Sequence, residues 1–232
     1  MKIVDATWEQ KNLGVTCYEV TFERGDKLSD VENNRDKFSE RQYLVLKVPN
    51  YRRDIAAVVQ SWGAKYIETA ITFQCDLRTW QLPESLKDIC ALSSYEPMND
   101  ADIEGMFDEI RKGIFKTDRV YLDPYFTHEQ AAQRYVNWSR DMLNKGHLPC
   151  KVMYCGETIG FFNEALSGVY SKFTGAGMGL LIQYSCIDVV RHIGKTKAEA
   201  VVSSNNPEVV NLRIKLGCLI KRMNNIFVKH ND

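Results

Sequence analysis

The sequence has no net charge and no apolar run long enough to span a membrane. Thirty basic residues balance thirty acidic ones among 232 residues. Without a positive surplus, no overall field attracts nucleic acid or an anionic membrane, so any anion site must be local. No uncharged apolar segment reaches the roughly 18 residues of a membrane span, and the opening MKIVDATWEQ has no apolar signal core. These absences predict a cytoplasmic protein that neither inserts into membranes nor binds nucleic acid.

Motifs for disulfides, metals and hydrolytic triads are also missing. The seven cysteines are odd in number and include no C-x-x-C pair, and most lie in apolar stretches as small hydrophobic residues do. This usage is typical of a reducing compartment. No metal-ligand spacing and no Ser-His-Asp signature is found, so we expect no metal site.

The first hundred residues alternate between strand-like and helix-like patterns. They predict strands over 15–22, 42–48 and 65–75, and helices over 28–40 and 51–63. Beyond Pro83 the pattern becomes irregular until a helix near 101–112. We therefore expect a smaller α/β domain over 1–98 and a second domain over 99–232.

The second domain continues in the same manner. It predicts a helix over 128–146, a hairpin from 149–155 and 158–166, a strand over 168–173, a helix over 178–193, a strand over 197–203, a helix over 206–216 and a strand over 218–230. This order is α/β (α+β in some schemes), with strands expected to pair in parallel on either side of the helix at 178–193.

A weak internal similarity links the two parts of the chain. Residues 55–73 resemble 210–228 in pattern when Gly63 is aligned with Gly217, because each segment contains a helix, a glycine and a closing strand. The pattern suggests two halves of related shape, although it is common among α/β proteins.

The clearest local motif is FTGAGMG at 173–179, immediately before the helix at 178–193. One interpretation is a tight turn from strand to helix, which glycine allows. The other is an anion cradle, because a helix N-terminus offers unpaired N–H groups and partial positive charge. The spacing matches neither a P-loop nor a dinucleotide fingerprint.

Two segments together resemble the GCN5-related N-acetyltransferases. TGAGMG is similar to the family's Arg/Gln-led glycine signature, with Thr174 at the Arg/Gln position. In NNPEVVNLRIKLGC, Asn206 lies eleven residues before Gly217, as in the family, and Cys218 replaces the usual Phe. The resemblance implies the acyltransferase fold of that family, a central mixed β-sheet flanked by helices. It also implies that the loop binds the diphosphate of acetyl-coenzyme A or another short-chain acyl-coenzyme A.

A further likeness covers most of the chain. ATWEQKNLGVTCYEV, with Trp8, Glu9 and Gly14, resembles the N-terminal segment of the dTDP-fucosamine acetyltransferases, which act on a nucleotide-linked amino sugar. The resemblance implies a small-molecule amine acceptor, with a dTDP-linked amino sugar as the leading class. It also implies a coenzyme site formed by Lys172, Phe173, Thr174, Gly175, Ala176, Gly177, Met178, Gly179, Leu180, Asn206 and Arg213.

The catalytic groups are predicted with alternatives. The family often places a proton-donating tyrosine seven residues after Asn206, where this chain has Arg213. Arginine stays protonated, so Arg213 either stabilises the departing thiolate by its charge, binds a coenzyme phosphate or faces solvent. Glu164 is the candidate base, with Tyr170 nearby in sequence. A surface charge at Glu164 and a chain of water molecules are the alternatives.

The oxyanion and acceptor sites are predicted from position. The resemblance implies that strand N–H groups at 172–174 stabilise the thioester oxyanion. The segment from Arg119 to Tyr125 carries a guanidinium, two phenols and a carboxylate, which suit a sugar phosphate. Arg119, Tyr121, Asp123 and Tyr125 are therefore the acceptor-site candidates, and a structural turn at Asp123 is the alternative.

The function predicted is acyl-coenzyme-A-dependent N-acyl transfer to a primary amine. Two alternatives stay open at this point. The acceptor is an amino acid, polyamine or protein amine, or the chain is a non-catalytic acyl-coenzyme-A-binding regulatory module. A homodimer paired through the strand at 218–230 is a further alternative, opposed by the lysines of that strand.

Overall fold

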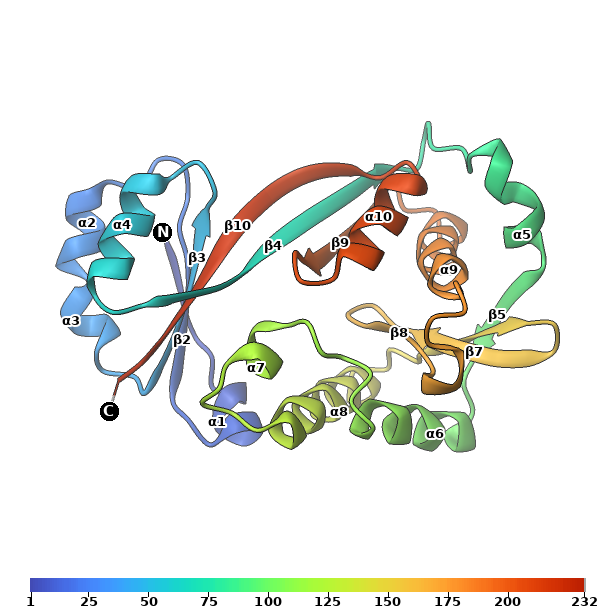
Figure 1. Cartoon of the computed structure of the whole chain (residues 1–232), viewed down its shortest axis with the longest axis horizontal. Helices are drawn as coiled ribbons and strands as arrows, with labels where there is room; N and C mark the ends of the chain where they lie inside the picture. Colours follow the sequence, from blue (N-terminus) through green and yellow to red (C-terminus); the bar gives the residue numbers. More distant parts are fainter. Residues whose placement is uncertain (232) are drawn as a thin grey trace.

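The computed structural model describes residues 1–231, which form two β-sheets with helices packed against them (Figure 1). The strands are β1 (Lys2–Asp5), β2 (Cys17–Thr21), β3 (Tyr43–Pro49), β4 (Lys65–Asp76), β5 (Ser93–Pro97), β6 (Cys150–Tyr154), β7 (Glu157–Phe162), β8 (Ser167–Val169), β9 (Lys197–Ser203) and β10 (Leu219–His230). The α-helices are α1 (Trp8–Leu13), α2 (Leu28–Asn33), α3 (Arg35–Phe38), α4 (Arg53–Ser61), α5 (Lys87–Ala91), α6 (Asp100–Arg111), α7 (Arg119–Leu122), α8 (His128–Asn144), α9 (Gly179–His192) and α10 (Pro207–Lys215), and two 3-10 turns are η1 (Glu84–Leu86) and η2 (Ser171–Phe173). The predicted α/β class is confirmed.

The larger sheet has the order β1-β2-β3-β10-β4-β9. Only β2 and β3 are parallel neighbours, and the other pairs are antiparallel. The last strand, β10, lies between β3 and β4, but β3 pairs only with its residues 224–230, whereas β4 pairs along 219–228. The suggested pairing of this strand across a dimer stays a prediction, and residues 219–223 have the edge that is unpaired in the described chain.

The internal similarity corresponds to a structural repeat. The unit β3-α4-β4, residues 43–76, recurs as β9-α10-β10, residues 197–230, and every element begins and ends 154 positions later. Hydrogen bonds recur as well. The Asn50 N–H donates to the Met223 carbonyl at 3.1 Å, and its counterpart, the Ser204 N–H, donates to the Thr69 carbonyl at 2.8 Å. The two units exchange their closing strands, so that β4 and β10 run side by side through the centre of the sheet (Figure 1).

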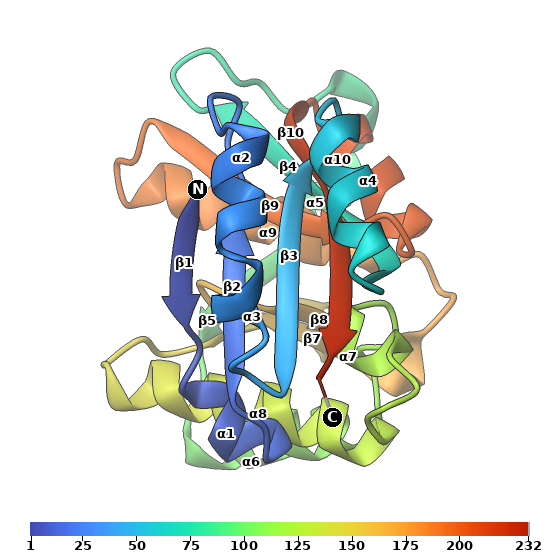
Figure 2. The same cartoon turned by 90° about the vertical axis from the view of Figure 1, so that its left-hand side faces the viewer.

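Successive side chains of β2 and β3 point to opposite faces of the larger sheet. Val20, Leu44 and Leu46 face α2, α3 and α4, which cover that side in Figure 2. Tyr43 and Val45 face the opposite side, where residues of α1, α7 and α8 complete a second core. The sheet is therefore buried on both sides here, which is why β3 reads as a continuous apolar run.

The smaller sheet, of order β5-β6-β7-β8, is antiparallel throughout. Ile159 of β7 packs in a core with Ile182 of α9. Phe161, on the other face, packs with residues of α6 and α8 such as Phe107 and Tyr135. This sheet carries β8, which leads into the glycine loop.

The expected parallel pairing around α9 is wrong. β8 lies at the edge of the smaller sheet and β9 at the edge of the larger one. The strand predicted over 168–173 ends at Val169 because the chain turns into η2, where the Ser171 N–H donates to Glu109 Oε2 at 2.6 Å. The two strands therefore separate beside α9.

The division at residue 98 stays a prediction. The larger sheet combines strands from both sides of it, because β4 pairs with both β9 and β10. Among residues 1–231, no helix combines the length and apolar character needed to cross a bilayer.

Candidate functional site

The glycine loop connects η2 to α9. Gly175 and Gly177 have φ angles of 80° and 76°, a region that favours glycine, and residues 174–177 are exposed. The Ala176 N–H donates to the Phe173 carbonyl at 3.1 Å. The N–H groups of Gly175, Gly177 and Met178 have no acceptor among residues 1–231. The loop thus presents unpaired donors at the N-terminus of a 14-residue helix, where the helix dipole adds positive charge.

Close packing fixes the start of this helix. A Cβ added to Gly179 would lie 3.1 Å from Leu212 Cδ1 of α10. Glycine at this first helical position lets α9 and α10 approach each other. The loop and α10 therefore form one unit.

The free edge of β8 supplies further donors. The Asn163 N–H donates to the Leu166 carbonyl at 2.8 Å, and the Tyr170 N–H donates to the Ile159 carbonyl at 3.0 Å. Because N–H directions alternate along an antiparallel pair, the N–H of Val169 points away from β7. No strand of the described chain pairs with that edge. The Val169 N–H therefore lies on the unpaired edge of the smaller sheet.

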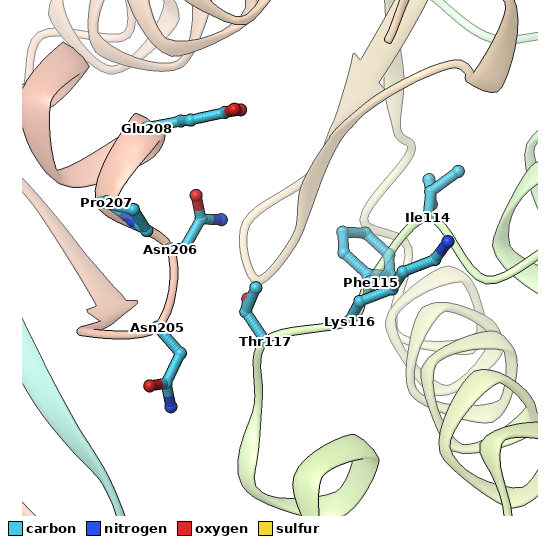
Figure 3. A pocket seen from close by; sticks show the side chains of 8 residues that line it. All are labelled: Ile114, Phe115, Lys116, Thr117, Asn205, Asn206, Pro207 and Glu208. Carbon is cyan, nitrogen blue, oxygen red and sulfur yellow. The ribbon is translucent and has the colours of Figure 1, made fainter. Parts of the chain in front are cut away.

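A cavity of about 320 Å³ opens beside this region, between the loop that precedes α7 and the turn that precedes α10 (Figure 3). It is lined by Ile114, Phe115, Lys116, Thr117, Asn205, Asn206, Pro207 and Glu208. Asn206 caps α10, since its Oδ1 accepts from the Val209 N–H at 3.1 Å. The cavity is open to solvent and carries polar groups on both walls, as a site for a polar small molecule requires.

Gly168 links this cavity to β8. A Cβ at Gly168 would lie 2.8 Å from Ile114 Cδ1 and 3.0 Å from Phe161 Cε1. Only glycine lets the wall carrying Ile114 rest directly on β8. The wall of the cavity that carries Ile114 therefore lies against one face of β8.

Arg213 is buried on α10 and has no carboxylate partner in the described chain. It is 7% exposed, and its Nε has no hydrogen-bond acceptor. Cys218 and Cys186 are its neighbours. A hydrogen bond from Cys75 and the Arg213 charge, which outweigh burial, lower the pKa of Cys218 to about 7. The side chain points into the protein and away from bulk solvent, so the solvent-facing alternative for Arg213 is wrong.

Glu68 is a buried acid on β4 that sequence reasoning missed. It is 8% exposed and lies beside the Ser203 hydroxyl of β9 and the Arg119 N–H of α7. Burial raises the pKa of Glu68, partly offset by these hydrogen bonds. Ser203 and Arg119 are each within two residues of a lining residue of the cavity, Asn205 and Thr117. The sequence around Glu68 gives no sign that this acid is buried. Its burial arises only when β4, β9 and α7, which are distant in the chain, pack together.

The four predicted acceptor residues are not among those that line the cavity. Arg119 is ion-paired with Glu9 at 2.9 Å and with Glu19 at 2.8 Å. Asp123 is 3% exposed, and its Oδ2 lies 2.8 Å from His230 Nε2. Arg119 and Asp123 are therefore engaged with other side chains of the protein, and the acceptor role predicted for them stays a prediction that this geometry does not support.

The two tyrosines of that segment also stack on neighbouring histidines. The ring centroids of Tyr121 and His128 are 4.0 Å apart, and those of Tyr125 and His230 are 3.9 Å apart. Tyr125 is otherwise exposed, at 57%. Both tyrosines lie at the far end of α7 from Thr117, so the structure does not bring them into the cavity.

The predicted catalytic residues Glu164 and Tyr170 are likewise separated from the cavity. Glu164 lies in the turn between β7 and β8, half exposed, with its Oε1 3.2 Å from His147 Nδ1. Tyr170 packs against Phe161 on the α6 side of the smaller sheet. Burial, with Asp102 and Glu109 nearby, raises the pKa of Tyr170 to about 12. The surface-charge alternative for Glu164 is the one that agrees with the structure.

Two of the three predicted oxyanion donors at 172–174 are engaged within the chain, whereas the Lys172 N–H is not among these pairs and its role stays a prediction. The N–H groups of Phe173 and Thr174 donate to the carbonyls of Tyr170 and Ser171 within η2, at 2.9 and 3.2 Å. They are unavailable to a ligand, whereas Val169 is not so engaged. Within the described part of the chain, no group of three or more His, Cys, Asp and Glu side chains is arranged to hold a metal ion.

Comparison with known proteins shows similarity at the level of structure. No protein-family model and no curated protein sequence matches the chain. The structure is similar to that of a GCN5-related N-acetyltransferase from Sphaerobacter thermophilus, with a TM-score of 0.62 and 12% identity over 99% of this chain and 76% of the other. A tandem GNAT protein from the clavulanic acid biosynthesis pathway matches with a TM-score of 0.52 and 14% identity over 93% of this chain and 75% of the other.

A third similar structure is the GCN5-related glucosamine N-acetyltransferase region of a fungal multi-domain GH3 β-N-acetylglucosaminidase. Its TM-score is 0.60 at 12% identity, over 98% of this chain and 31% of the other. At these identities the similarity concerns the fold. The chain has the fold of the GCN5-related N-acetyltransferases, as the sequence predicted, whereas the nucleotide-amino-sugar branch stays a prediction.

Proposed function

We propose that this chain is an acyl-coenzyme-A-dependent N-acyltransferase that transfers an acetyl or short acyl group to a primary amine. The observation that carries the proposal is the glycine loop, where unpaired N–H groups of Gly175, Gly177 and Met178 lie at the N-terminus of α9. Such a terminus favours a phosphate or diphosphate. The unpaired Nε of Arg213 and the free edge of β8 support the same conclusion.

We assign a separate role in the reaction to each of these groups of residues. Acetyl-coenzyme A supplies an acyl group activated as a thioester. The loop amides donate to its diphosphate, and the Val169 N–H is assigned to the carbonyl oxygen as negative charge develops there. Asn206 and Lys116 line the cavity through which the amine reaches the free edge of β8.

Arg213 is proposed to stabilise the sulfur that leaves. Its guanidinium is permanently charged and has no carboxylate partner within 4 Å in the described residues, so a developing thiolate would be its counter-ion. Replacing Arg213 with Ala should lower turnover more than coenzyme affinity. Unchanged turnover and affinity would refute this role.

The amino group of a nucleotide-linked sugar is our leading acceptor. One structural neighbour is named as a glucosamine N-acetyltransferase region, which provides a precedent for the sugar amine. Lys116 in the cavity wall offers a cation for a nucleotide phosphate. Amino acids, polyamines and protein amines are the competing acceptors.

Calorimetry with acetyl-coenzyme A, followed by a turnover assay with each class of amine, tests the proposal. We expect saturable binding and transfer to at least one amine. Binding without turnover across the panel would instead support a regulatory acyl-coenzyme-A-binding module. Failure to bind acetyl-coenzyme A would refute the proposed function.

A further inference from the structure

Glu68 occupies an unusual position in the sheet. It lies in the N-terminal part of β4, the strand that the N-terminal repeat unit exchanges into the C-terminal half, and only 8% of its surface is exposed. Its neighbours belong to the two elements that flank the cavity: Ser203 ends β9, and Arg119 begins α7. The acid is thus close to the segments that continue into the two cavity walls, although it is not itself one of the lining residues.

Glu68 lies beside the Ser203 hydroxyl and the Arg119 N–H, but neither the repeat nor the main cap of α7 requires a carboxylate at this position. The position of Glu68 in the repeat corresponds to Arg222 of β10, an exposed residue, so the repeat itself does not need a buried acid. The N-terminus of α7 is already capped by Asp118, whose Oδ1 accepts from the Tyr121 N–H at 3.1 Å.

Nor does Glu68 have a cation to neutralise. No basic nitrogen of the described residues lies within 4.0 Å of its carboxylate, because the Arg119 guanidinium is already committed to Glu9 and Glu19. A buried carboxyl group without a counter-ion is costly. Such groups in clefts are candidates for proton transfer.

We infer that Glu68 is the general base of the reaction, accepting the proton of the acceptor ammonium at the inner end of the cavity between Thr117 and Asn205. This inference rests on the proposed function. It also makes the N-terminal half part of the active site, because the C-terminal half alone lacks this carboxylate.

The proton balance follows from the chemistry of amide formation. Glu68 takes one proton from the ammonium, which frees the nitrogen lone pair. The amine nitrogen then forms a bond to the thioester carbonyl carbon, and the carbon–sulfur bond breaks. The second amine proton leaves as the amide forms and goes to the sulfur, and Glu68 returns its proton to solvent. The sum is an ammonium and a thioester converted to an amide, a thiol and one proton.

The pH dependence reflects every group that faces Glu68. These groups are Asp118, which caps α7, Arg119 of α7, Tyr135 of α8 and Ser203 of β9. Burial and the Asp118 charge raise the pKa of Glu68, and Ser203 and Arg119 oppose the rise. Because the base must be ionised, activity should fall on acidification through a pKa above the ordinary glutamate value.

Glu68→Gln in the full-length protein tests the inference. Glutamine keeps the size and hydrogen-bonding capacity of the side chain but cannot accept the proton. We expect kcat to fall by about 10²–10⁴-fold, the KM for acetyl-coenzyme A to change little, and the acidic limb of the pH profile to disappear. Glu68→Asp should recover part of the rate, whereas Glu164→Gln, a half-exposed control acid outside the cavity, should retain full activity.

The outcomes separate this inference from the proposed function. If the wild type turns over and Glu68→Gln retains both its rate and its acidic limb, Glu68 is not the base although the enzyme is an acyltransferase. If the wild type does not bind acetyl-coenzyme A in calorimetry, the proposed function itself fails. Circular dichroism and the melting temperature of Glu68→Gln establish that the variant is folded. If it does not fold, an intermediate rate and retained acidic limb in Glu68→Asp support the role, and a wild-type rate refutes it.

Discussion

Arg134 and Glu9 form a buried bidentate ion pair across 125 residues of sequence. Arg134 Nη2 lies 2.7 Å from Glu9 Oε1, and Arg134 Nε lies 2.9 Å from Glu9 Oε2. Glu9 is fully buried, and Arg119 also donates to its Oε1 at 2.9 Å. The pair joins α1 to α8 and so connects the start of the chain to the helix next to the cavity wall.

Replacing Glu9 with Gln should destabilise the protein by about 3–5 kcal/mol, because a buried arginine loses its counter-ion. Urea unfolding at neutral pH measures this change. Glu164→Gln, a half-exposed acid, is the control and should stay within about 0.5 kcal/mol of wild type. Equal stability of the two variants would contradict a structural role for the pair.

The same pair predicts acid sensitivity. Burial alone would raise the pKa of Glu9, but the hydrogen bonds and charges of Arg134 and Arg119 hold it below its ordinary value of 4.5. A lowered folded pKa contributes stability at pH values above the unfolded pKa, and that contribution is lost as pH falls through the folded pKa. The free energy of unfolding should therefore fall less on acidification in Glu9→Gln than in wild type.

Gly177→Val should weaken acetyl-coenzyme A binding by at least about tenfold, equivalent to about 1.4 kcal/mol. Valine at a φ of 76° distorts the loop and shields its amide donors. Gly194→Val is the matched control, because Gly194 also has a φ of 76°, is exposed and lies at the other end of α9. Equal calorimetric affinity losses in both variants would count against the loop as the anion site.

Gly160→Ala should cost about 3 kcal/mol or more in unfolding experiments, because its Cβ would lie 2.2 Å from the Gly168 carbonyl oxygen and would force β7 and β8 apart. Gly105→Ala is the opposite case. It lies within α6 with no atom within 4 Å of its added Cβ, so it should stabilise the protein by about 0.5–1 kcal/mol. A mild effect at Gly160 would show that the hairpin tolerates displacement.

Arg213→Met should raise the pKa of Cys218 from about 7, because it removes the positive charge beside the thiol. Cys75→Ala should raise it as well by removing a hydrogen bond. Thiolate ultraviolet absorbance against pH measures both, with Cys218→Ser in each background as the blank. Coincident titration curves in wild type and Arg213→Met would exclude this contact.

Much of the fold could be predicted because its elements carry local signals. The strand at 197–203 and the helix after Asn206 follow from alternation and from a capping side chain. The repeat was detectable through Gly63 and Gly217. The exchange of β4 and β10 could not be predicted. The alternation of apolar and polar residues along a strand indicates which face is buried, but it does not indicate which strand lies beside it.

The part of the candidate site that could be predicted is the part in which backbone conformation restricts the residue type. The glycine loop was found because positive φ angles demand glycine. The ion pairs of Arg119 and Asp123 could not be predicted, because their partners, Glu9 and His230, are more than a hundred residues away in sequence. Glu68 was missed for the same reason, since its neighbours meet it only after the exchange.

The exchange of closing strands also affects biosynthesis. β4 ends at residue 76 and β10 begins at residue 219, so a ribosome working at about 5–20 residues per second leaves β3 and β4 without their common neighbour for roughly 7–30 seconds. During that interval two apolar strand edges are open to pairing with other nascent chains. This molecule therefore completes its larger sheet only late in translation, and chaperone supply should influence its yield more than its final stability does.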